Sequence, residues 1–378
     1  MKIVVLGAGR IGGAIVRDLS EESDYSITVV DLDPQAMERL EGFGVETMLS
    51  DLSFRDHVTE AVADADLVVG CVPGFMGYQT VEAVLEAGKP VVDISFFEED
   101  AFGLDELAKR RGVPCLIDCG VAPGLTNLIL GWMEASLDET TSFKALIGGL
   151  PVERGWPWEY KAPFSPAHVL QEYVRPARMR IHGEDVTLPA LSEVELVHFP
   201  GLGTLEAFNT DGLRSLLRTS QIPNMVEKTL RYPGHADRMK MLREAGFFSD
   251  REIMAPSGMV RPRDVTETLL FDAWHFEEGE PDLTVGQITV EGVADGKRVR
   301  HTYHLLDYYN PDTETSSMAR TTGYTCAAMA RLVANGLWTE PGVAPGEIVG
   351  RSKACYDFVL EHLAERGVSL FHRVESLG

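Results

Sequence analysis

Basic residues are scarce in this sequence of 378 residues. It has 34 lysines and arginines against 58 aspartates and glutamates, which gives a formal net charge of −24. Nucleic acids and anionic membranes bind to positively charged surfaces, so this balance disfavours both as partners. Hydrophobic residues make up 44% of the chain, which is ordinary for a globular protein, and the expected partner is a small molecule.

Cysteines and long apolar runs are also few. There are five cysteines, an odd number, and only Cys115 and Cys119 are close in sequence, so no zinc pattern is present and we predict no metal site. Reduced thiols in a cytosolic protein are the simplest interpretation. The first apolar run, residues 3–6, leads directly into a glycine motif and is far shorter than the roughly 20 residues of a membrane span. We therefore expect a cytoplasmic protein.

The first third of the chain alternates short apolar runs with helical patterns. We expect strands at residues 3–6, 27–30, 45–48, 67–72, 91–94 and 115–117, and helices at residues 11–19, 34–41, 56–63, 80–87 and 104–111. Such a β-α-β-α series predicts a parallel sheet with helices on both faces. The predicted fold class is therefore α/β, with a doubly wound Rossmann domain over residues 1–121.

The character of the sequence changes after Asp118, where glycine, proline and aromatic residues become more frequent. Residues 283–291 and 298–305 alternate apolar and polar side chains, and the Asp295-Gly296 pair between them favours a hairpin turn. We predict a second, α+β substrate domain over residues 122–315 that contains a mixed or antiparallel sheet and the oligomer contacts. Helical patterns return at residues 316–336 and 352–366.

The string Gly7-Ala8-Gly9-Arg10-Ile11-Gly12 follows a predicted strand and opens a predicted helix, which is the context of a dinucleotide-binding turn. Gly7 permits the tight turn, Gly9 lets the backbone approach the pyrophosphate, and Gly12 lets helix and strand pack closely. The free N–H groups at the start of the helix then face the phosphates. The alternative is a glycine-rich turn without a ligand. Arg10 and Ile11 belong to the same predicted cofactor site.

Asp31 ends the second predicted strand, about 20 residues after the glycines, where an acid accepts hydrogen bonds from the adenine ribose. A carboxylate at this position repels a 2′-phosphate. The predicted cofactor is therefore NAD rather than NADP, although Arg10 could soften the choice.

Two further segments are candidates for the cofactor site. Asp51 ends the third predicted strand, and it either lies near the adenine or caps a helix. The run Cys71-Val72-Pro73 follows the fourth predicted strand. It either borders the nicotinamide half of the cofactor or is simply a turn that ends the strand.

Stretches beyond the Rossmann unit carry a family resemblance. In chain order they are 118–124 (DCGVAPG), 148–151 (GGLP), Glu159-Tyr160, Phe164-Ser165, 205–210 (LEAFNT), 231–235 (RYPGH) and 318–322 (MARTT). Together they resemble the saccharopine-dehydrogenase-like superfamily, and most closely its short bacterial and archaeal branch, which includes lysine 6-dehydrogenase. The resemblance spans nearly the whole chain.

This resemblance implies a Rossmann domain, a substrate domain and C-terminal helices, about residues 316–378, that pack back on the first domain. It also implies NAD-linked oxidation at a C–N bond. Lysine 6-dehydrogenases convert lysine and NAD to the 6-semialdehyde, ammonia and NADH. The chain departs from that branch at residues 94–100, where those enzymes look rich in glycine and histidine, and at Lys161, where they carry asparagine. Both segments are expected to border the substrate.

Oxidation of an amine needs a base that takes protons from the ammonium group. The first candidates are His235, which can titrate near neutral pH and is predicted on a turn, and Asp118, at the carboxyl end of the last Rossmann strand. His235 could instead be a loop histidine with a structural role, and Asp118 could cap the turn that follows it. Lys161 and Tyr160 are weaker candidates, since an exposed lysine is the ordinary alternative.

The substrate carboxylate needs a cation. Arg231 and Arg214 are the preferred candidates and Arg320 is the third, because a guanidinium group binds a carboxylate through two parallel hydrogen bonds. Each could instead form an ion pair at a domain interface. Asn209 and Thr210 could hydrogen-bond the α-amino group or the nicotinamide amide. The aromatic residues Trp156, Trp158 and Phe164 could line the aliphatic chain, but aromatics are more often part of the core.

The leading hypothesis is therefore an NAD-dependent enzyme that oxidatively deaminates an amino-acid side chain, with L-lysine as the first choice of substrate. The second is an enzyme that forms or cleaves a secondary amine, as saccharopine and carboxynorspermidine dehydrogenases do. A third hypothesis, from another class, is a sensor protein that binds NAD without turnover. Enzymes of this kind are usually symmetric oligomers, so we expect a homodimer or homotetramer.

Overall fold

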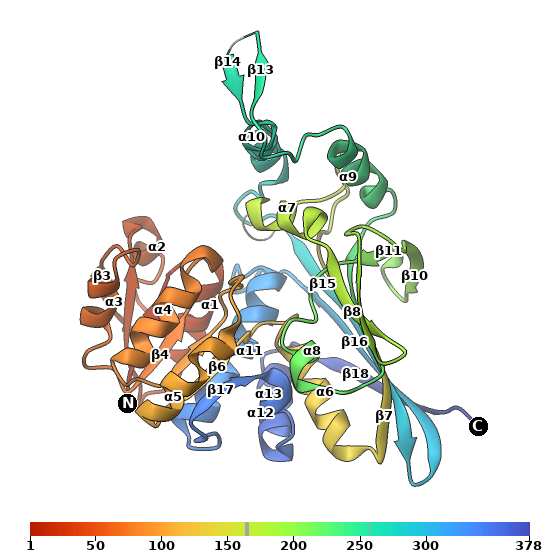
Figure 1. The fold of residues 1–378 in the computed structure, drawn as a ribbon. Helices are drawn as coiled ribbons and strands as arrows, with labels where there is room; N and C mark the ends of the chain where they lie inside the picture. The colour runs from red at the N-terminus through yellow and green to blue at the C-terminus, as the bar shows by residue number, and fades with distance from the viewer. Residues whose placement is uncertain (163–165, 257) are drawn as a thin grey trace. The chain divides into compact units, whose positions relative to one another are not determined.

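The computed structural model describes residues 1–162, 166–256 and 258–378, and omits the side chains of residues 166–168 (Figure 1). Phe164 and Ser165, named above, lie outside the described residues. The chain divides into two compact units. Unit 1 comprises Met1–Ser136 and Ala319–Ser369, and unit 2 comprises Leu137–Met318 and Leu370–Gly378. Each unit is described by itself.

Unit 1 contains a seven-stranded sheet in which every strand pair is parallel, in the order β17-β6-β5-β4-β1-β2-β3. Its strands are β1 (Lys2–Leu6), β2 (Ser26–Asp31), β3 (Glu46–Leu49), β4 (Leu67–Gly70), β5 (Val91–Asp93), β6 (Pro114–Ile117) and β17 (Gly342–Pro345). The central strands are buried on both faces, so their side chains form continuous apolar runs.

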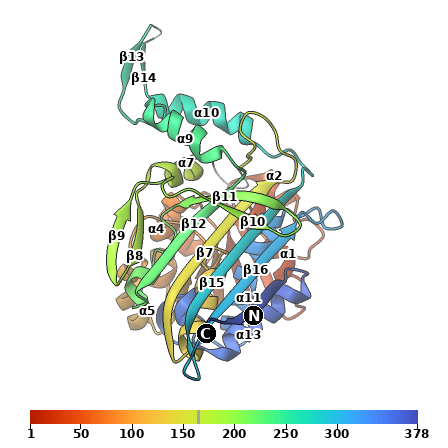
Figure 2. The same cartoon turned by 90° about the vertical axis from the view of Figure 1, so that its right-hand side faces the viewer.

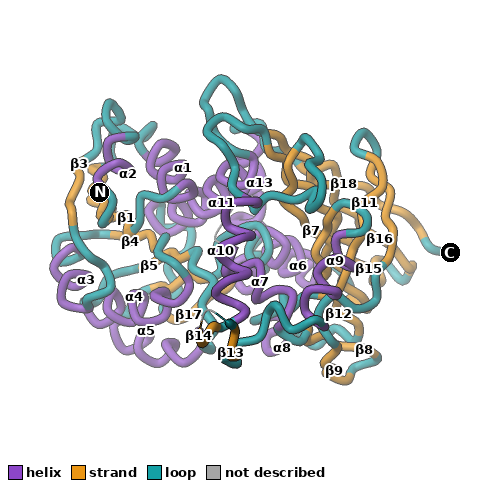
Figure 3. Tube along the Cα trace, turned by 90° about the horizontal axis from the view of Figure 1, so that it is seen from above, coloured by secondary structure: helices purple, strands orange, loops and turns teal. Residues whose placement is uncertain are grey.

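Helices cover both faces of this sheet. In Figure 3, α1 and α2 lie on one side of the strands, and α3, α4 and α5 lie on the other. The helices are α1 (Arg10–Leu19), α2 (Pro34–Glu38), α3 (Arg55–Ala61), α4 (Gly74–Glu86), α5 (Asp105–Arg111), α6 (Leu125–Ser136), α11 (Ser317–Ala334, whose first residues belong to unit 2), α12 (Gly346–Val349) and α13 (Lys353–Glu365), with a 3-10 turn at Ala101–Leu104. The predicted doubly wound α/β fold is confirmed.

Unit 2 contains a nine-stranded mixed sheet, in which only β12 and β7 pair in parallel. Strands β7, β15, β16 and β12 run side by side through its centre (Figure 2). The strands are β7 (Glu139–Pro151), β8 (Ala177–Ile181), β9 (Glu184–Leu188), β10 (Glu195–Phe199), β11 (Gly203–Asn209), β12 (Asn224–Arg231), β15 (Asp282–Ala294), β16 (Lys297–Tyr308) and β18 (Leu370–Ser376). The predicted mixed sheet is therefore present.

The remaining elements of unit 2 are α7 (Pro166–Val174), α8 (Leu216–Thr219), α9 (His235–Glu244), α10 (Pro262–Trp274) and a small hairpin of β13 (Ile253–Ala255) and β14 (Gly258–Val260). The predicted turn between β15 and β16 is observed. Both of its residues have positive φ, 51° at Asp295 and 71° at Gly296, which matches the twist of the two strands.

The structure differs from the predicted elements in three respects. Unit 1 continues past residue 121 through α6, where Asn127 donates a hydrogen bond of 2.9 Å to Glu347, 220 residues later in the chain. Strand β4 ends at Gly70, and α4 begins already at Gly74. Strands β17 and β18 were not expected, and β18 adds the last residues of the chain to the sheet of unit 2.

A buried ion cluster joins the helices of unit 1. Asp18 on α1 is paired with Arg331 on α11 and with His362 and Arg366 on or after α13. Burial raises the pKa of Asp18, but the hydrogen bond from His362 and the charge of Arg331 outweigh this, so the pKa lies below its ordinary value. The N- and C-terminal parts of unit 1 are thus joined by charge as well as by packing.

We expect Asp18→Asn to lower the free energy of unfolding by about 3–5 kcal/mol, because the buried Arg331 then keeps only the exposed Glu22, 3.3 Å away, as a counter-charge. The lowered pKa means that the stabilisation from Asp18 is present above the ordinary carboxyl pKa and is lost as the pH falls through the folded-state value. Urea denaturation at several pH values measures both effects. Glu82→Gln removes an exposed ion pair with Arg55 and should cost less than about 1 kcal/mol.

Candidate active site

The glycine turn after β1 has the geometry of a dinucleotide site. Gly7 has a φ of 110°, and a Cβ there would lie 2.7 Å from the carbonyl oxygen of Cys71. A Cβ at Gly12 would overlap the carbonyl oxygen of Gly7. A Cβ at Gly9, in contrast, would meet no atom within 4 Å. Two glycines are therefore needed by the fold itself, while the third faces open space, where the backbone can approach a pyrophosphate.

Asp31 ends β2 directly beside this turn. Its Oδ2 accepts a hydrogen bond of 2.5 Å from the backbone N–H of Ala8, and its Oδ1 accepts one of 2.9 Å from that of Asp33. The carboxylate is thus held at the glycine turn, as the ribose-binding role requires. The residues present fit a nicotinamide dinucleotide.

The other predicted cofactor residues differ in what surrounds them. Arg10 is the first residue of α1 and is exposed, and Ile11 is half-buried beside it. Asp51 accepts a hydrogen bond of 3.0 Å from the backbone N–H of Ser53 in the turn before α3, but the N-cap of that helix is Phe54, so Asp51 is not the helix cap that the alternative expected. In the run Cys71-Val72-Pro73, the backbone of Cys71 packs against Gly7, and Pro73 caps α4.

Substitution of Gly12 and of Gly9 should have different effects, one on stability and the other on cofactor binding. We expect Gly12→Ala to destabilise unit 1 by more than about 2 kcal/mol, because the new methyl group overlaps backbone. Gly9→Ala should leave the unfolding midpoint unchanged and weaken NADH binding roughly 10- to 100-fold, because the methyl group occupies the space for the phosphates. NADH fluorescence titration and thermal unfolding separate the two effects. Equal behaviour of the two variants would contradict this assignment.

Asp118 follows β6 and is buried, with a φ of 55° that is unusual for a residue other than glycine. Asp93, at the end of neighbouring β5, is also buried and accepts a hydrogen bond of 2.8 Å from the hydroxyl of Ser95. The carboxyl ends of these parallel strands therefore carry two buried carboxyl groups, at the edge of the sheet where α/β proteins bind ligands.

In unit 2, His235 is the first residue of α9 rather than part of a turn, and it is fully buried. Its Nε2 accepts a hydrogen bond of 2.8 Å from the hydroxyl of Tyr173, and its Nδ1 donates one of 3.3 Å to the carbonyl of Trp158. Burial and the charge of Arg231 lower its pKa to about 3. An imidazole with so low a pKa binds a proton only weakly, and both of its nitrogens are already hydrogen-bonded, so the geometry favours the structural alternative for His235.

Arg231 lies at the end of β12 in the same buried region. Its Nη2 donates hydrogen bonds of 3.3 Å to the hydroxyl of Tyr160 and to the carboxylate of Glu172, and its guanidinium lies 4.4 Å from the centroid of the Tyr160 ring. Among the described residues its Nε–H has no hydrogen-bond partner. A buried guanidinium with a donor to spare can take an anionic group.

Thr210 lies near the same strand and touches a carboxyl group that we did not predict. Its hydroxyl donates a hydrogen bond of 2.7 Å to Glu227 and lies 2.8 Å from the hydroxyl of Thr229. Glu227, Thr229 and Arg231 alternate along β12 and so share one face of the sheet. Asn209 instead donates to Ser192 and Glu193, 3.0 Å and 3.1 Å away.

Three other predicted residues make their contacts elsewhere. Lys161 is ion-paired with Glu280. Arg214 lies in the connection between β11 and α8 with a φ of 43°. Arg320 belongs to unit 1, where its guanidinium donates a hydrogen bond of 3.1 Å to the carbonyl of Arg366.

The sequence reasoning missed Glu172, Tyr173, Glu206 and Glu227. Glu206 accepts hydrogen bonds from the backbone N–H groups of Gly234 and Ala236, 2.7 Å and 2.5 Å away, and so holds the start of α9 in place. The two-residue period of β12 could have placed Glu227 on the face of Arg231. Nothing in the local sequence indicates the contacts from α7.

Burial raises the pKa of Glu227 to about 7. The pKa of Glu227 is therefore higher in the folded state than in the unfolded state. The stability linked to this carboxyl group is fully present below the ordinary glutamate pKa and is lost as the pH rises through about 7. We expect Glu227→Gln to be more stable than the wild type at pH 8, by on the order of 3 kcal/mol, and to show a flatter stability profile above pH 5. Urea denaturation across this range tests the expectation, and parallel profiles would contradict it.

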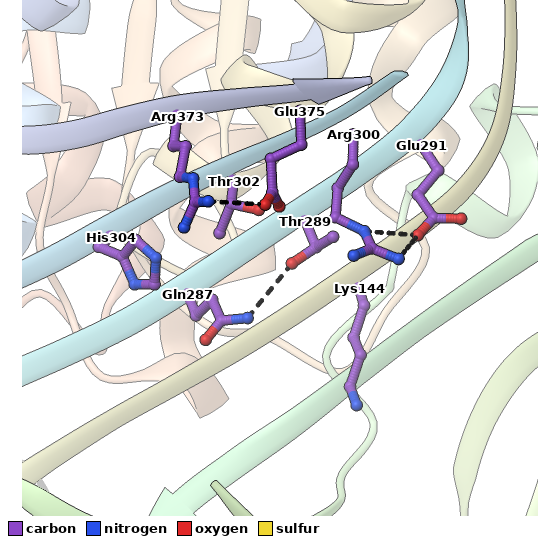
Figure 4. Close-up of a pocket in the computed structure, with 9 residues that line it drawn as sticks. All are labelled: Lys144, Gln287, Thr289, Glu291, Arg300, Thr302, His304, Arg373 and Glu375. Carbon is purple, nitrogen blue, oxygen red and sulfur yellow. Dashed lines mark hydrogen bonds and ion pairs between the residues drawn. The ribbon is translucent and has the colours of Figure 1, made fainter. Parts of the chain in front are cut away.

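A shallow hollow lies on the opposite face of the sheet (Figure 4). Its charged residues pair with one another or with close neighbours: Arg300 with Glu291, Arg373 with Glu375, and Lys144 with Glu195. None of the predicted site residues lines it. The candidate regions, each described within its own unit, are therefore the glycine turn of unit 1 and the surroundings of Arg231 in unit 2.

The residues that the structure describes contain no group of three or more histidine, cysteine, aspartate or glutamate side chains placed to hold a metal ion. No helix among them has the length and apolar character needed to cross a bilayer.

Two family models match this chain. The model for the saccharopine dehydrogenase NADP binding domain matches residues 3–116, and the model for the saccharopine dehydrogenase C-terminal domain matches residues 120–368. The saccharopine dehydrogenase [NADP(+), L-glutamate-forming] of Schizosaccharomyces pombe is 23% identical over 97% of this chain and 98% of its own length. An alpha-aminoadipic semialdehyde synthase of Arabidopsis thaliana is 25% identical over 65% of this chain and 27% of its own length.

A solved structure supports the fold. The apo saccharopine dehydrogenase (L-Glu forming) of Saccharomyces cerevisiae aligns with a TM-score of 0.81 and 19% identity, over 99% of both chains. The C-terminal family model alone covers more than half of the chain. This chain therefore belongs to the saccharopine dehydrogenase family and is a nicotinamide-dependent oxidoreductase of that family.

Proposed function

We propose that this enzyme uses NAD to oxidise a C–N bond on the side chain of an amino acid, with L-lysine as the leading substrate. The bound nicotinamide would accept hydride from the carbon that carries the nitrogen. With lysine, water completes the reaction, and the products are the 6-semialdehyde, an ammonium ion, NADH and a proton. The protein's part is to hold the substrate, to place its nitrogen and to accept a proton.

The observation that carries this proposal is the environment of Arg231. Its guanidinium is buried, stacks on Tyr160 and has an Nε–H without a partner among the described residues. Leaving such a donor unpaired in the interior is costly, and a substrate carboxylate would satisfy it. Glu172, which occupies one side of the guanidinium through a bond of 3.3 Å, shows that a carboxylate fits there.

Two other arginines of unit 2, both on β8, already have partners. Arg178 binds Asp211 through two hydrogen bonds of 2.9 Å. Arg180 donates to Asp185 and to two backbone carbonyls. A substrate with three carboxylates, such as saccharopine, would need cations other than these two. Lysine brings one carboxylate and a second amine, which suits a region that also contains Glu172 and Glu227.

The proton acceptor is proposed among the buried carboxyl groups. Asp118, in unit 1, remains a candidate for the base that accepts the proton. Glu227 is a second candidate, because a pKa of about 7 matches proton transfer near neutral pH. The low pKa and the two hydrogen bonds of His235 speak against that residue.

A second function is favoured by the comparisons. The chain matches a glutamate-forming saccharopine dehydrogenase over nearly its whole length, so cleavage of a secondary amine to glutamate and a semialdehyde is the alternative. Arg214 or Arg320 would then be expected to bind further carboxylates.

NADH formation distinguishes the two functions. The purified chain is incubated at alkaline pH with NAD and, separately, L-lysine, L-saccharopine or a panel of other diamines and amino acids. We expect lysine to give NADH and free ammonia. Turnover of saccharopine alone, with glutamate as a product, would establish the alternative. Tight NADH binding without turnover of any amine would contradict both.

A further inference from the structure

One edge of the Arg231 guanidinium is only weakly used within unit 2. Its Nη1 donates a hydrogen bond of 2.9 Å to the backbone carbonyl of Leu230, which fixes the group at the end of β12. Nε and Nη2 form another edge, which can bind a carboxylate through two parallel hydrogen bonds. On this edge Nε–H has no partner among the described residues, and Nη2 donates long bonds of 3.3 Å to Tyr160 and Glu172.

Glu172, on α7, is the acidic partner of that edge, and it is held loosely. One of its oxygens lies 3.3 Å from Nη2, whereas a strong bond between a guanidinium and a carboxylate measures about 2.7–2.9 Å. The pair of Arg178 and Asp211 in the same unit shows the tight form, with two bonds of 2.9 Å. The side chain of Glu172 is 31% exposed, against 4% for Arg231, so Glu172 is the outer member of the pair and can turn away from the guanidinium.

The charge of Glu172 is also incompletely compensated. Burial raises the pKa of Glu172 above its ordinary value, and the positive charges of Arg231 and Arg175 do not offset this effect. A carboxylate in such surroundings is stabilised by a further cation. Arg231, which has an N–H group to spare, is stabilised by a further anion. The two residues therefore offer places for one negative and one positive group, side by side.

An α-amino acid carries these two groups on one carbon atom. Its carboxylate can take the Nε and Nη2 donors of Arg231, and Glu172 can then turn from Nη2 to the α-ammonium group. In this exchange each charge of the protein receives a partner of opposite sign, so no unpaired charge is left in the interior. A carboxylic acid without the ammonium group would displace Glu172 from the guanidinium and offer it nothing in return.

We propose that Arg231 and Glu172 together bind the α-amino-acid group of the substrate, and that Glu172 is the specificity-determining residue that selects an α-ammonium group beside the carboxylate. The inference rests on the proposed function, which assigns the substrate carboxylate to Arg231. It gives Glu172 a role of its own, because Glu172 occupies the edge that the carboxylate needs and yields it only to a ligand that supplies a cation. Keto acids and hydroxy acids, which lack the ammonium group, are then poor ligands.

Two probes without a side-chain amine test this inference apart from turnover. L-Norleucine has the α-carboxylate, the α-ammonium group and an apolar chain, and hexanoate is the same molecule without the ammonium group. Calorimetry on the full chain in the presence of NADH measures both dissociation constants. We expect the wild type to bind L-norleucine about 10- to 100-fold more tightly than hexanoate, because the ammonium group gains a charge-assisted hydrogen bond. In Glu172→Gln this ratio should fall below about threefold, while hexanoate itself binds more tightly because a competing carboxylate has been removed.

The controls separate this role from a structural one. Glu195→Gln removes a carboxylate of similar exposure that is paired with Lys144 and Lys228, and it should keep the wild-type ratio. Glu172→Asp keeps the charge on a shorter side chain and should give an intermediate ratio, which decides the test if Glu172→Gln does not fold in thermal unfolding. A wild-type ratio near one, binding of neither probe, or a wild-type ratio in the Glu172 variants would overturn the proposal.

The proposed function can fail separately from this inference, because neither probe can be oxidised at a side-chain amine. Oxidation of L-lysine by the wild type, combined with an unchanged ratio in Glu172→Gln, would keep the proposed function and overturn the role of Glu172. The expected ratios without any oxidation of lysine would support the role of Glu172 and remove lysine as the substrate.

Discussion

Asp31→Ser should shift the ratio of kcat/KM values for the two coenzymes toward NADP by about 100- to 1000-fold. The carboxylate is held at the glycine turn by the N–H groups of Ala8 and Asp33, so it has little freedom to move away from a 2′-phosphate. Removing it abolishes a like-charge repulsion of up to about 4 kcal/mol near the surface and charge-assisted hydrogen bonds of about 1.5–3 kcal/mol to the ribose.

Initial rates with each coenzyme over a concentration range measure the effect. Asp33→Ser is the matched control, because Asp33 caps α2 by accepting from the backbone N–H of Gln35 rather than facing the turn. Serine is as good an N-cap as aspartate, so this variant should leave the stability nearly unchanged and the coenzyme ratio within about fivefold of the wild type. The result is informative because the family model that matches residues 3–116 is named for NADP. A wild type that prefers NADP would show that Arg10 or the backbone outweighs Asp31.

Arg231→Lys is expected to lower kcat/KM for lysine by about 100- to 1000-fold while NADH binding stays unchanged. Lysine at this position keeps a positive charge beside Glu172 but cannot supply the planar pair of N–H donors that a carboxylate needs. The coenzyme turn lies in unit 1 and Arg231 in unit 2, so the two measurements report on separate parts of the protein.

A substrate without the carboxylate isolates this role. With 1,5-diaminopentane, which is lysine without its carboxylate, the wild type should be slow and Arg231→Lys should lower its rate less than tenfold. An equal loss on both substrates would indicate that Arg231 acts through the fold. Thermal unfolding of the variant checks the same point, and Arg178→Lys serves as the matched arginine outside the proposed contact, since it is paired with Asp211.

Local sequence patterns were sufficient for the Rossmann half of the chain. The glycine spacing, the apolar runs and Asp31 act through neighbouring residues, and a short parallel strand, its turn and the following helix have few alternatives. The same holds for the β15–β16 hairpin, where Asp295 and Gly296 select the turn. Most of these elements were therefore predicted to within a few residues, with the exception of α4, which begins at Gly74 rather than at residue 80.

The unit boundary, strand β18 and the surroundings of His235 depend on contacts between distant segments, which no local sequence pattern indicates. Asn127 and Glu347 extend unit 1 beyond the predicted boundary, and β18 joins the sheet of unit 2 after a long excursion through unit 1. His235 has the residue type of a base, but Tyr173, Trp158 and Arg231 bury it and hold it neutral. A residue type states what chemistry a side chain can perform, whereas the solvent and the charges around it, which come from the assembled chain, determine its pKa and its role.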